Sequence, residues 1–405
     1  MRHRLAATAA ALTAIVLAPL GAATAAPAPT STADRAATAV DATGTFVPLP
    51  GARILDTRSG VGASAPGRLG QQITSTLQVA GRGGVPAMGV EAVVLNVTGV
   101  DAVANTWVTV WPTGTTVPNA SQLNVVGGET AANLVTLPRG ADGKVNLYNG
   151  SGTLHLLADV VGYYAVAGGT VGGGFHPAAA PHRPYASRGT VQPWAAGAAR
   201  RVPVGAPGMD ASITAVSVSL TAQSTTSGWL TAWSGQGAMP PTSTVNYRRG
   251  WPASNHAIVP VTRDAQGQPW ITVFASSGGT GVIADVLGWY DGQIDADGYR
   301  FTVTTPTRAL DYREVGAGWS VPVPTAQVAP GAVAVVANVL GHYPSYPTWI
   351  GVSPTAGKPA ASTVNVAPYQ NRSNSTVVST AGSGFHVYNV TGVVKVSVDV
   401  QGYFS

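Results

Sequence analysis

The sequence contains no cysteine. Because thiols are absent, no disulfide framework, thiolate metal site or thiol nucleophile is possible. Charged residues are also scarce, at 10% of the chain against roughly 25% in an average soluble domain. Hydrophobic residues nevertheless reach 45%, which is far too many for a disordered polar chain. We therefore expect a folded protein, in which 50 glycines and 30 prolines supply many turns.

Clusters of positive charge are missing as well. Lysine occurs only at positions 144, 358 and 395, and the arginines are scattered, with the densest pairs at 200–201 and 248–249. This arrangement resembles neither a nucleic-acid-binding stripe nor a polybasic membrane patch. We therefore do not expect nucleic acid as a partner.

Only one long apolar run is present, near residue 1. Arg2 and Arg4 precede the alanine-rich stretch 5–20, and an A-x-A cleavage pattern follows at 23–25. A transmembrane anchor is the competing interpretation, but the short run and its small-residue end favour a secretory signal peptide over residues 1–26. No other apolar run reaches the about 18 residues of a membrane span. We expect an exported chain in which residues 27–44, rich in Ala, Thr and Pro, form a flexible stalk.

Four short motifs recur three times along the rest of the chain. The run 159–164 (DVVGYY) returns as 285–290 (DVLGWY) and as 399–404 (DVQGYF). An S-x-x-N pattern recurs at 121–124, 243–246 and 362–365, and each copy is preceded by a tryptophan, at 107, 229 and 349. Each unit opens with an R-x-x-D-x-R element, at 53–58 and 308–313, which the middle copy keeps only in degraded form at 183–188. The sequence therefore contains three copies of one unit.

The length of the unit indicates what kind of repeat it is. About 120 residues is the size of a whole domain, whereas solenoid and propeller repeats span roughly 20–50 residues. We therefore expect three tandem domains of one fold, over residues 45–165, 175–291 and 300–405. Their boundaries fall at the glycine-rich segment 166–174 and at 291–299.

The local pattern predicts an all-β fold. Segments such as 93–98 (VVLNVT), 107–111 (WVTVW), 134–137 (LVTL) and 144–148 (KVNLY) are short, rich in valine, threonine and aromatic residues, and separated by turn residues. Asp142-Gly143 between two such runs is a hairpin signal. Short strands at this spacing indicate sandwiches or barrels. We expect a β-sandwich or jelly-roll-like domain of seven to nine strands in each repeat.

The repeated polar residues are candidates for structural anchors. Asn96 and Asn338 interrupt apolar strands, and Ser219 takes their place in the second copy. A buried amide must be hydrogen-bonded, so we expect these side chains to bond their own neighbours. The S-x-x-N amides suit turns and strand ends, although ligand contact is the alternative. These amides are Asn124, Asn246 and Asn365.

The R-x-x-D-x-R element predicts ion pairs. In a strand its fourth and sixth residues share a face, so Asp56 and Arg58 are expected to pair, with each other or with Asp159. The closing aspartates of the three copies are expected to accept from such arginines. The middle copy keeps Arg188 but lacks a counterpart of Asp56, which argues against a shared catalytic role. The remaining anchors of this kind are Arg53, Asp285, Arg308, Asp311, Arg313 and Asp399.

Searches for a metal site or an active site find no convincing motif. Residues 295–298 (DADG) resemble the start of a calcium loop, but position twelve is Pro306 instead of a bidentate glutamate, so a linker turn is favoured. The sequence has neither H-E-x-x-H nor G-x-S-x-G. Its 17 acidic residues lie mainly in turns, where paired carboxylates for glycoside hydrolysis are not expected. We therefore predict no metal, no cofactor and no enzymatic activity.

Aromatic residues are the best candidates for binding. The repeated tryptophans at 107, 229 and 349 start strands, and we expect them to be core anchors. The unrepeated aromatics are more suited to stacking on sugars or contacting a protein. The predicted ligand-binding residues are Trp111, Trp233, Trp251, Tyr343 and Tyr346.

The motifs together resemble a known family. The opening R-[IL]-L-D-T-R, the N-x-S-x-L-N segment at 119–124, the N-L-V at 133–135 and the closing D-V-x-G-Y-[YF] are similar to a secreted β-repeat of actinobacteria such as Streptomyces. In those proteins the repeat occurs alone, in tandem or attached to cell-wall-active enzymes. The resemblance covers residues 46–404, and the second copy departs from it by losing the D-T of its opening motif. It implies an exported accessory protein associated with the cell envelope.

Three functional hypotheses remain. The first is a secreted, non-catalytic binding protein that recognises cell-wall or extracellular polysaccharide, or a surface protein. The second is a structural or assembly spacer without a ligand of its own. The third is an unrecognised extracellular hydrolase. Three copies would strengthen binding in the first case, because repetition raises the effective concentration of weak sites.

Overall fold

The structure is a computed structural model that describes residues 43–167, 171–187, 193–292 and 297–405. The predicted signal peptide and nearly all of the predicted stalk lie outside these ranges. Within them the chain is all-β, and no helix is long and apolar enough to cross a membrane. The first strand begins at Thr43, so the last two residues assigned to the stalk belong to the fold.

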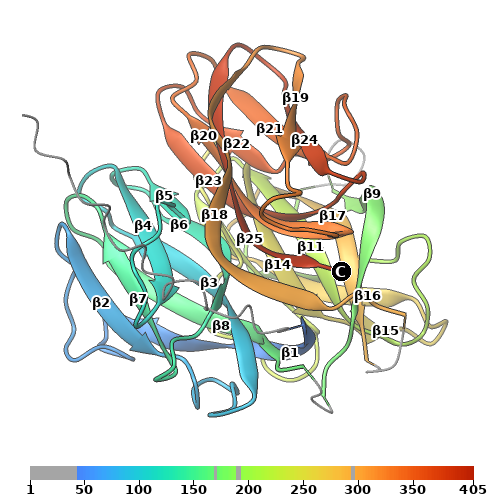
Figure 1. Cartoon of the computed structure of the whole chain (residues 1–405), viewed down its shortest axis with the longest axis horizontal. Helices are drawn as coiled ribbons and strands as arrows, with labels where there is room; N and C mark the ends of the chain where they lie inside the picture. Colours follow the sequence, from blue (N-terminus) through green and yellow to red (C-terminus); the bar gives the residue numbers. More distant parts are fainter. Residues whose placement is uncertain (1–42, 168–170, 188–192, 293–296) are drawn as a thin grey trace, which may run out of the picture. The chain divides into compact units, whose positions relative to one another are not determined.

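The first repeat contains eight strands (Figure 1). They are β1 (Thr43–Asp56), β2 (Ile73–Gln78), β3 (Val90–Val100), β4 (Thr106–Pro112), β5 (Leu123–Val125), β6 (Ala131–Pro138), β7 (Lys144–Asn149) and β8 (His155–Ala165). One sheet has the order β1-β8-β3-β6 and the other the order β2-β7-β4-β5.

The other two repeats have the same strand order. The second comprises β9 (Phe175–Ala186), β10 (Ala198–Pro203), β11 (Ile213–Ser224), β12 (Gly228–Trp233), β13 (Val245–Tyr247), β14 (Ala253–Pro260), β15 (Thr262–Arg263), β16 (Pro269–Ala275) and β17 (Thr280–Asp291). The third comprises β18 (Phe301–Val315), β19 (Ser320–Pro324), β20 (Ala334–His342), β21 (Thr348–Ser353), β22 (Val364–Val366), β23 (Asn371–Ser379), β24 (Gly384–Asn389) and β25 (Val394–Phe404). Their sheets run β9-β17-β11-β14 with β10-β16-β12-β13, and β18-β25-β20-β23 with β19-β24-β21-β22.

This strand order defines the fold of each repeat. When the short β15, which pairs only with β16, is set aside, every repeat places its strands as 1-8-3-6 and 2-7-4-5, which is a jelly roll. The predicted all-β, sandwich or jelly-roll-like fold is therefore confirmed. The separation into three tandem domains stays a prediction, because residues 41–405 group into one compact unit.

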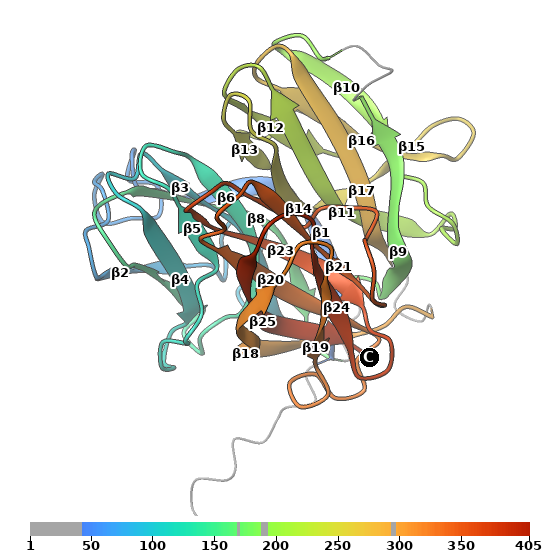
Figure 2. The same cartoon turned by 90° about the horizontal axis from the view of Figure 1, so that it is seen from above.

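Each jelly roll has its own hydrophobic core between its two sheets. The strands reach it by the two-residue period of extended chain. In β7, for example, Val145 and Leu147 are fully buried, while Lys144, Asn146 and Tyr148 are only partly covered. Figure 2 shows the strands of the three repeats as three groups that can be followed by colour.

A fourth hydrophobic cluster joins the repeats to one another. The opening phenylalanine of each repeat pairs in register with the last aromatic residue of the same repeat. Rings from different repeats then pack together, with centroid distances of 4.1 to 4.4 Å. Tyr164 stacks on Phe301 and Phe404 on Phe175, and Tyr290 packs against Phe46 in a tilted arrangement. The repeats therefore share a buried aromatic centre.

The described parts of the segments between repeats also pair with neighbouring strands. Phe46 exchanges backbone hydrogen bonds of 2.9 and 3.0 Å with Gly173, and Phe175 exchanges two of 2.8 Å with Tyr299. In addition, β1 pairs with β18, which joins the sheets of the first and third repeats into one of eight strands. A Cβ on Gly174 would lie only 2.5 Å from the backbone of Gly298. These glycines therefore permit close backbone approach.

Candidate functional site at the junctions between repeats

A row of polar side chains crosses three strands of the first repeat. Arg53 on β1, Asp159 on β8 and Asn96 on β3 are direct neighbours in the ladder. The Arg53 guanidinium donates to both oxygens of Asp159, at 2.8 and 3.1 Å. Burial raises the pKa of the Asp159 carboxyl, and the hydrogen bonds from Arg53 oppose this shift. The arginine thus compensates a carboxylate that solvent does not reach.

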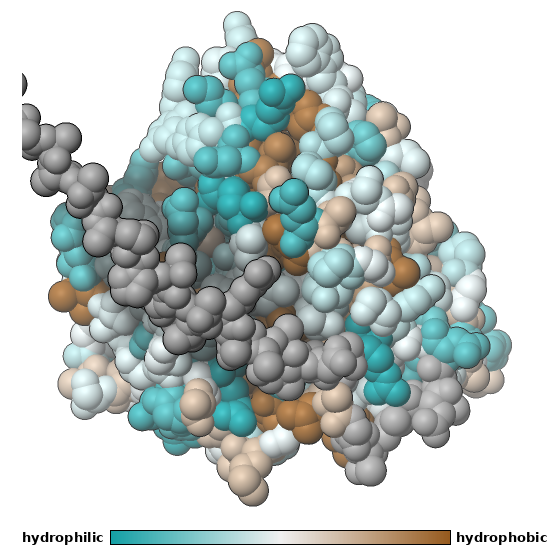
Figure 3. Space-filling view, in the orientation of Figure 1, coloured by the Kyte–Doolittle hydropathy of each residue, from teal (hydrophilic) through white to brown (hydrophobic). Residues whose placement is uncertain are grey.

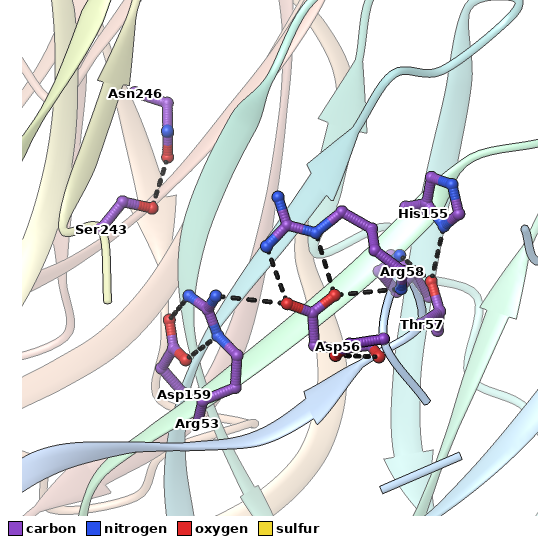
Figure 4. A network of polar contacts seen from close by, with 10 residues as sticks. Arg53, Asp56, Thr57, Arg58, His155, Asp159, Ser243 and Asn246 are labelled. Atoms are coloured by element: carbon purple, nitrogen blue, oxygen red, sulfur yellow. Dashed lines mark hydrogen bonds and ion pairs between the residues drawn. The ribbon is translucent and has the colours of Figure 1, made fainter. Parts of the chain in front are cut away.

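Asp56 lies between two arginines of the same opening element (Figure 4). The Arg58 guanidinium donates to the two carboxylate oxygens of Asp56 at 2.9 and 2.7 Å. The Nη1 of Arg53 lies 3.4 Å from the Oδ2 of Asp56. The side-chain hydrogen bond from Arg58 holds the pKa of the Asp56 carboxyl below its usual value, against a smaller effect of burial. The expected pairing of Asp56 with Arg58 therefore occurs, whereas the partner of Asp159 is Arg53 and not Arg58.

The other two repeats keep the ion pair between the first arginine and the closing aspartate, but differ in the remaining contacts of the opening element. Arg183 forks onto Asp285 at 2.7 and 3.0 Å, and Arg308 donates to Asp399 at 2.5 Å and also to Asp311. In all three copies the first arginine thus meets the closing aspartate. Arg188 lies outside the described residues. Arg313 is exposed and forms no ion pair with Asp311 in the part of the chain that the structure describes.

The sequence predicts that the buried asparagines bond to their own neighbours, and this prediction is wrong: they bond to other repeats. Asn96 donates to the carbonyl of Ser243 in the second repeat at 2.6 Å and accepts from Asn255 at 2.9 Å. Asn338 of the third repeat makes the equivalent bonds to Ser121 and Asn133 of the first repeat, at 2.8 and 2.9 Å. The recurring amides therefore fasten one repeat to the next.

The remaining junction, between the second and third repeats, uses a histidine instead. Ser219 replaces the asparagine there, and its hydroxyl has no partner in the described structure. His256 lies nearby in the ladder, opposite Ser219. Its Nε2 is 2.8 Å from the Ser217 hydroxyl and its Nδ1 is 3.3 Å from the hydroxyl of Ser375 in the third repeat. The histidine thus bridges the two repeats.

This histidine predicts a dependence of stability on pH. Burial lowers the pKa of His256 to about 3, from 6.5 in the unfolded chain. Below pH 6.5 the unfolded state therefore binds a proton that the folded state refuses. The free energy of unfolding should fall by up to about 1.4 kcal/mol per pH unit as the pH drops from 6.5 towards 3. Urea unfolding of wild type and His256→Gln between pH 7 and 5 checks this; equal pH slopes in the two proteins would contradict it.

The S-x-x-N motif closes on itself and supports the junctions. Each serine hydroxyl lies near the asparagine side chain of the same motif, at 3.2, 3.0 and 3.5 Å in the three copies. The amide of Asn365 also donates to Ser254 of the second repeat at 2.8 Å. Because the carbonyls of Ser121 and Ser243 accept from the next repeat, these loops form part of each junction.

The repeated tryptophans are not the core anchors that we expected. Trp107 is 41% exposed and Trp229 is 45% exposed. The strand period explains why: Val108 and Leu230, the next residues, point into the cores and are fully buried, so the tryptophans face outward. The alternation W-V-T-V-W already contained this signal. Both tryptophans line grooves between repeats.

The larger groove lies between the first and third repeats and has a volume of about 720 Å³. Trp107, Tyr148 and Asn124 line it from the first repeat, and Arg308 and Asp311 from the third. The Arg308 guanidinium also donates to the carbonyl of Asn119 across the groove at 3.1 Å. One wall is thus aromatic and the opposite wall carries charged, planar hydrogen-bonding groups.

Two further residues of the third repeat shape this wall. Tyr312 has a φ of 45°, which is rare for a bulky residue, and its ring stacks on His342 with centroids 4.1 Å apart. Burial lowers the pKa of His342 to about 4, so this side chain is neutral near pH 7. Its Nδ1 and the Oδ1 of Asn371 have no hydrogen-bond partner in the described structure, and both residues line the groove.

The second groove, of about 370 Å³, repeats this plan between the first and second repeats. Trp229 and Asn246 line it from the second repeat, and Arg53 and Arg58 from the first. In the third repeat Trp349 is half-buried: the Lys358 ammonium lies 5.8 Å from its ring, and the Tyr388 ring lies 5.9 Å away. Of the three repeated tryptophans, those at positions 107 and 229 are therefore the exposed ones.

The five aromatic residues predicted to bind ligand do not share one face. Trp111 and Trp233 are buried, at 7% and 9% exposure, although Trp111 lines the larger groove. Trp251 lines a separate cavity. Tyr343 and Tyr346 are well exposed but line none of the cavities described here.

On the face of the molecule that Figure 3 shows, hydrophobic residues appear in small groups among hydrophilic ones. Scattered apolar residues of this kind need no special explanation. Within the described residues no group of three histidine, aspartate or glutamate side chains is arranged to hold a metal ion. The predicted calcium-like turn lies partly outside the described residues.

Comparison with known proteins adds little to this description. No protein-family model and no curated protein matches the chain. A solved chain described as "The Triple Jelly Roll Fold and Turret Assembly in an Archaeal Virus" is similar with a TM-score of 0.19 and 8% sequence identity, over 89% of this chain and 91% of that chain. A likeness at this TM-score carries no argument, so the fold rests on the strand order described above.

Proposed function

We propose that this protein is a secreted, non-catalytic binding protein that holds polysaccharide in the grooves between its repeats. The observation that carries the proposal is the exposure of Trp107 and Trp229 at equivalent positions of two grooves. Large aromatic side chains dominate binding when they become covered. A tryptophan ring offers a flat apolar face that suits the C–H faces of a sugar ring.

The surroundings of the tryptophans also suit a sugar. Arg308, Asp311 and Asn124 in one groove, and Arg53 and Asn246 in the other, provide donors and acceptors for ring hydroxyls. A site that combines an apolar surface with a few convergent polar groups is typical of small-molecule recognition. Two such grooves on one chain would raise the apparent affinity for a polymer through effective concentration.

The carboxylates in the grooves favour binding over hydrolysis. Hydrolysis of a glycosidic bond uses two carboxyl groups on either side of the bond. Among the described residues that line them, Asp311 is the single carboxylate of the larger groove and the smaller groove has none. Asp311 is also paired with Arg308. This arrangement supports a protein that holds its polysaccharide without cutting it.

Tryptophan substitution tests the proposal. Trp107→Ala and Trp229→Ala should each weaken binding to a polysaccharide selected from a panel of purified cell wall, cellulose, chitin and soluble glycans by about 10- to 100-fold. The double variant should lose measurable binding. Trp319→Ala is the matched control, because Trp319 is 66% exposed but lines neither groove. Absence of wild-type binding across the panel, or unchanged binding by the double variant, would refute the proposal.

A further inference from the structure

A separate cavity of about 400 Å³ lies where all three repeats meet. The first repeat contributes residues 128–132, the second contributes residues around Trp229 and Trp251, and the third contributes Asn365 and Arg372. Trp229 and Asn246 line both this cavity and the smaller groove. A chain bound in that groove can therefore reach the cavity.

Three charged side chains, one from each repeat, meet in this cavity. The carboxylate of Glu129 accepts from Arg248 at 2.6 Å and from Arg372 at 2.5 Å. These side chains are 14%, 39% and 20% exposed, in that order. Two guanidinium groups thus share one carboxylate, which leaves one positive charge uncompensated among them.

The cavity offers many free donors and few free acceptors. A guanidinium has five N–H groups, and Arg248 and Arg372 each use only one in the hydrogen bonds of the described structure. The Oδ1 of Asn246 accepts from Ser243, so its free group is the NH₂ donor. The hydroxyl of Ser227 already accepts from the backbone of Arg249. A ligand that fits these groups must bring acceptors, preferably with negative charge.

The cluster of Glu129, Arg248 and Arg372 does not recur in the three repeats. Counted from the asparagine of S-x-x-N, Glu129 is five residues after Asn124, Arg248 two after Asn246, and Arg372 seven after Asn365. The three charges therefore come from non-equivalent positions and form one site per molecule. In contrast, the ion pair between the first arginine of the opening element and the closing aspartate recurs in every repeat.

We propose that this cavity binds the anionic group, a carboxylate or a phosphate, of an acidic polysaccharide. The forked guanidinium geometry matches both groups, and a partly enclosed site strengthens the attraction relative to open water. The inference rests on the proposed function, because the polymer reaches the cavity from the groove lined by Trp229. It adds the prediction that the preferred ligand is acidic.

Titration with three soluble polymers of similar length tests this inference. The probes are oligogalacturonate, which carries carboxylates, a phosphomannan oligomer, which carries phosphates, and a neutral glucose oligomer. Wild-type protein should bind at least one acidic polymer about tenfold more tightly than the neutral one, and this preference should shrink as the salt concentration rises. The acidic polymer that binds more tightly identifies the anionic group. Equal binding of all three polymers would overturn the inference.

Substitutions then locate the effect. Arg248→Gln and Arg372→Gln should each remove most of the preference for the acidic polymer and leave neutral binding unchanged. Arg249→Gln is the matched control, because it removes the same charge from a neighbouring residue that does not line the cavity. If Arg249→Gln weakens acidic binding as much as Arg372→Gln, the attraction is only a general effect of charge and the inference is wrong.

If the arginine variants are unstable, a third variant tests the inference through a gain of affinity for the acidic polymer. Glu129→Gln removes the competing carboxylate and leaves both guanidinium groups for the ligand, so acidic binding should tighten severalfold. Weaker acidic binding by this variant would contradict the inference. Trp107→Ala separates the two proposals, because Trp107 lines the larger groove and not the cavity. This variant should weaken the binding of neutral and acidic polymers alike and leave the preference for the acidic polymer unchanged.

Discussion

Replacing Gly162 with alanine is expected to lower the free energy of unfolding by about 3 kcal/mol or more. The glycine belongs to the closing motif of the first repeat, and a Cβ there would lie 2.6 Å from Cε2 of Phe46 and 2.9 Å from the carbonyl oxygen of Val47. Overpacking a buried site costs typically 1–3 kcal/mol and occasionally more. Here one neighbour is backbone and the other is a ring of the shared aromatic centre, so neither can move away easily.

Denaturant unfolding measures this effect against a matched control. Gly67→Ala should change stability by less than about 0.5 kcal/mol, because a Cβ at Gly67 meets no atom within 4 Å. Gly288 and Gly402 contact Phe175 and Phe301 in the same way, so alanine there should have similar effects. A near-neutral Gly162→Ala would show that Phe46 does not lie over the closing motif.

Replacing Arg53 with leucine is expected to cost about 3–5 kcal/mol at pH 7. The substitution leaves the carboxylate of Asp159, which is fully buried, without its partner. Burial already raises the pKa of Asp159 despite Arg53, and without the arginine the pKa should rise further. Because the folded variant then binds a proton that the unfolded chain releases above pH 3.8, its stability should fall as the pH rises above about 4.

The pH dependence distinguishes this mechanism from a general loss of packing. The destabilisation caused by Arg53→Leu should be smaller at pH 4.5 than at pH 7, and Asp159→Asn in the same chain should restore part of the loss at pH 7. A destabilisation that is the same at both pH values, with no rescue by asparagine, would show that the ion pair does not determine the effect.

The sequence was sufficient to predict the all-β class and the short strands of each repeat, but not the order of the strands in the sheets. The β pattern depends on the alternation of neighbouring residues, as in the K-V-N-L-Y run of β7, where the buried residues are Val145 and Leu147. The four recurring motifs located the three units, because the same strand order requires the same local chemistry at the same places. The sequence predicted that an arginine of the opening element meets the closing aspartate, and the register in the structure identifies it as the first arginine.

The contacts between repeats could not be predicted in the same way. Alternation shows that Asn96 leaves the hydrophobic pattern of its strand, but not that its partners are Ser243 and Asn255, more than a hundred residues away. The glycines around position 174 read as a boundary, whereas they let two backbones meet. Non-local packing of this kind depends on how whole sheets meet, and no short sequence window contains that information.

The repeated tryptophans illustrate a prediction that is wrong. Their recurrence predicts a core role, but the next residues, Val108 and Leu230, occupy the core face of the strand. The tryptophans at positions 107 and 229 recur at the surfaces where one repeat packs against another, and there they line the grooves between the repeats.

Calorimetry tests the central claim, that the three repeats form one unit through their recurring residues. The contacts that join the repeats are the aromatic centre, the asparagine pairs and the bond from Arg308 to Asn119. If these contacts hold the repeats together, thermal unfolding should show a single transition. Its calorimetric enthalpy should be about equal to the van't Hoff enthalpy. Three separable transitions, or a ratio of about 3 between the two enthalpies, would show that the repeats unfold independently and would contradict the account.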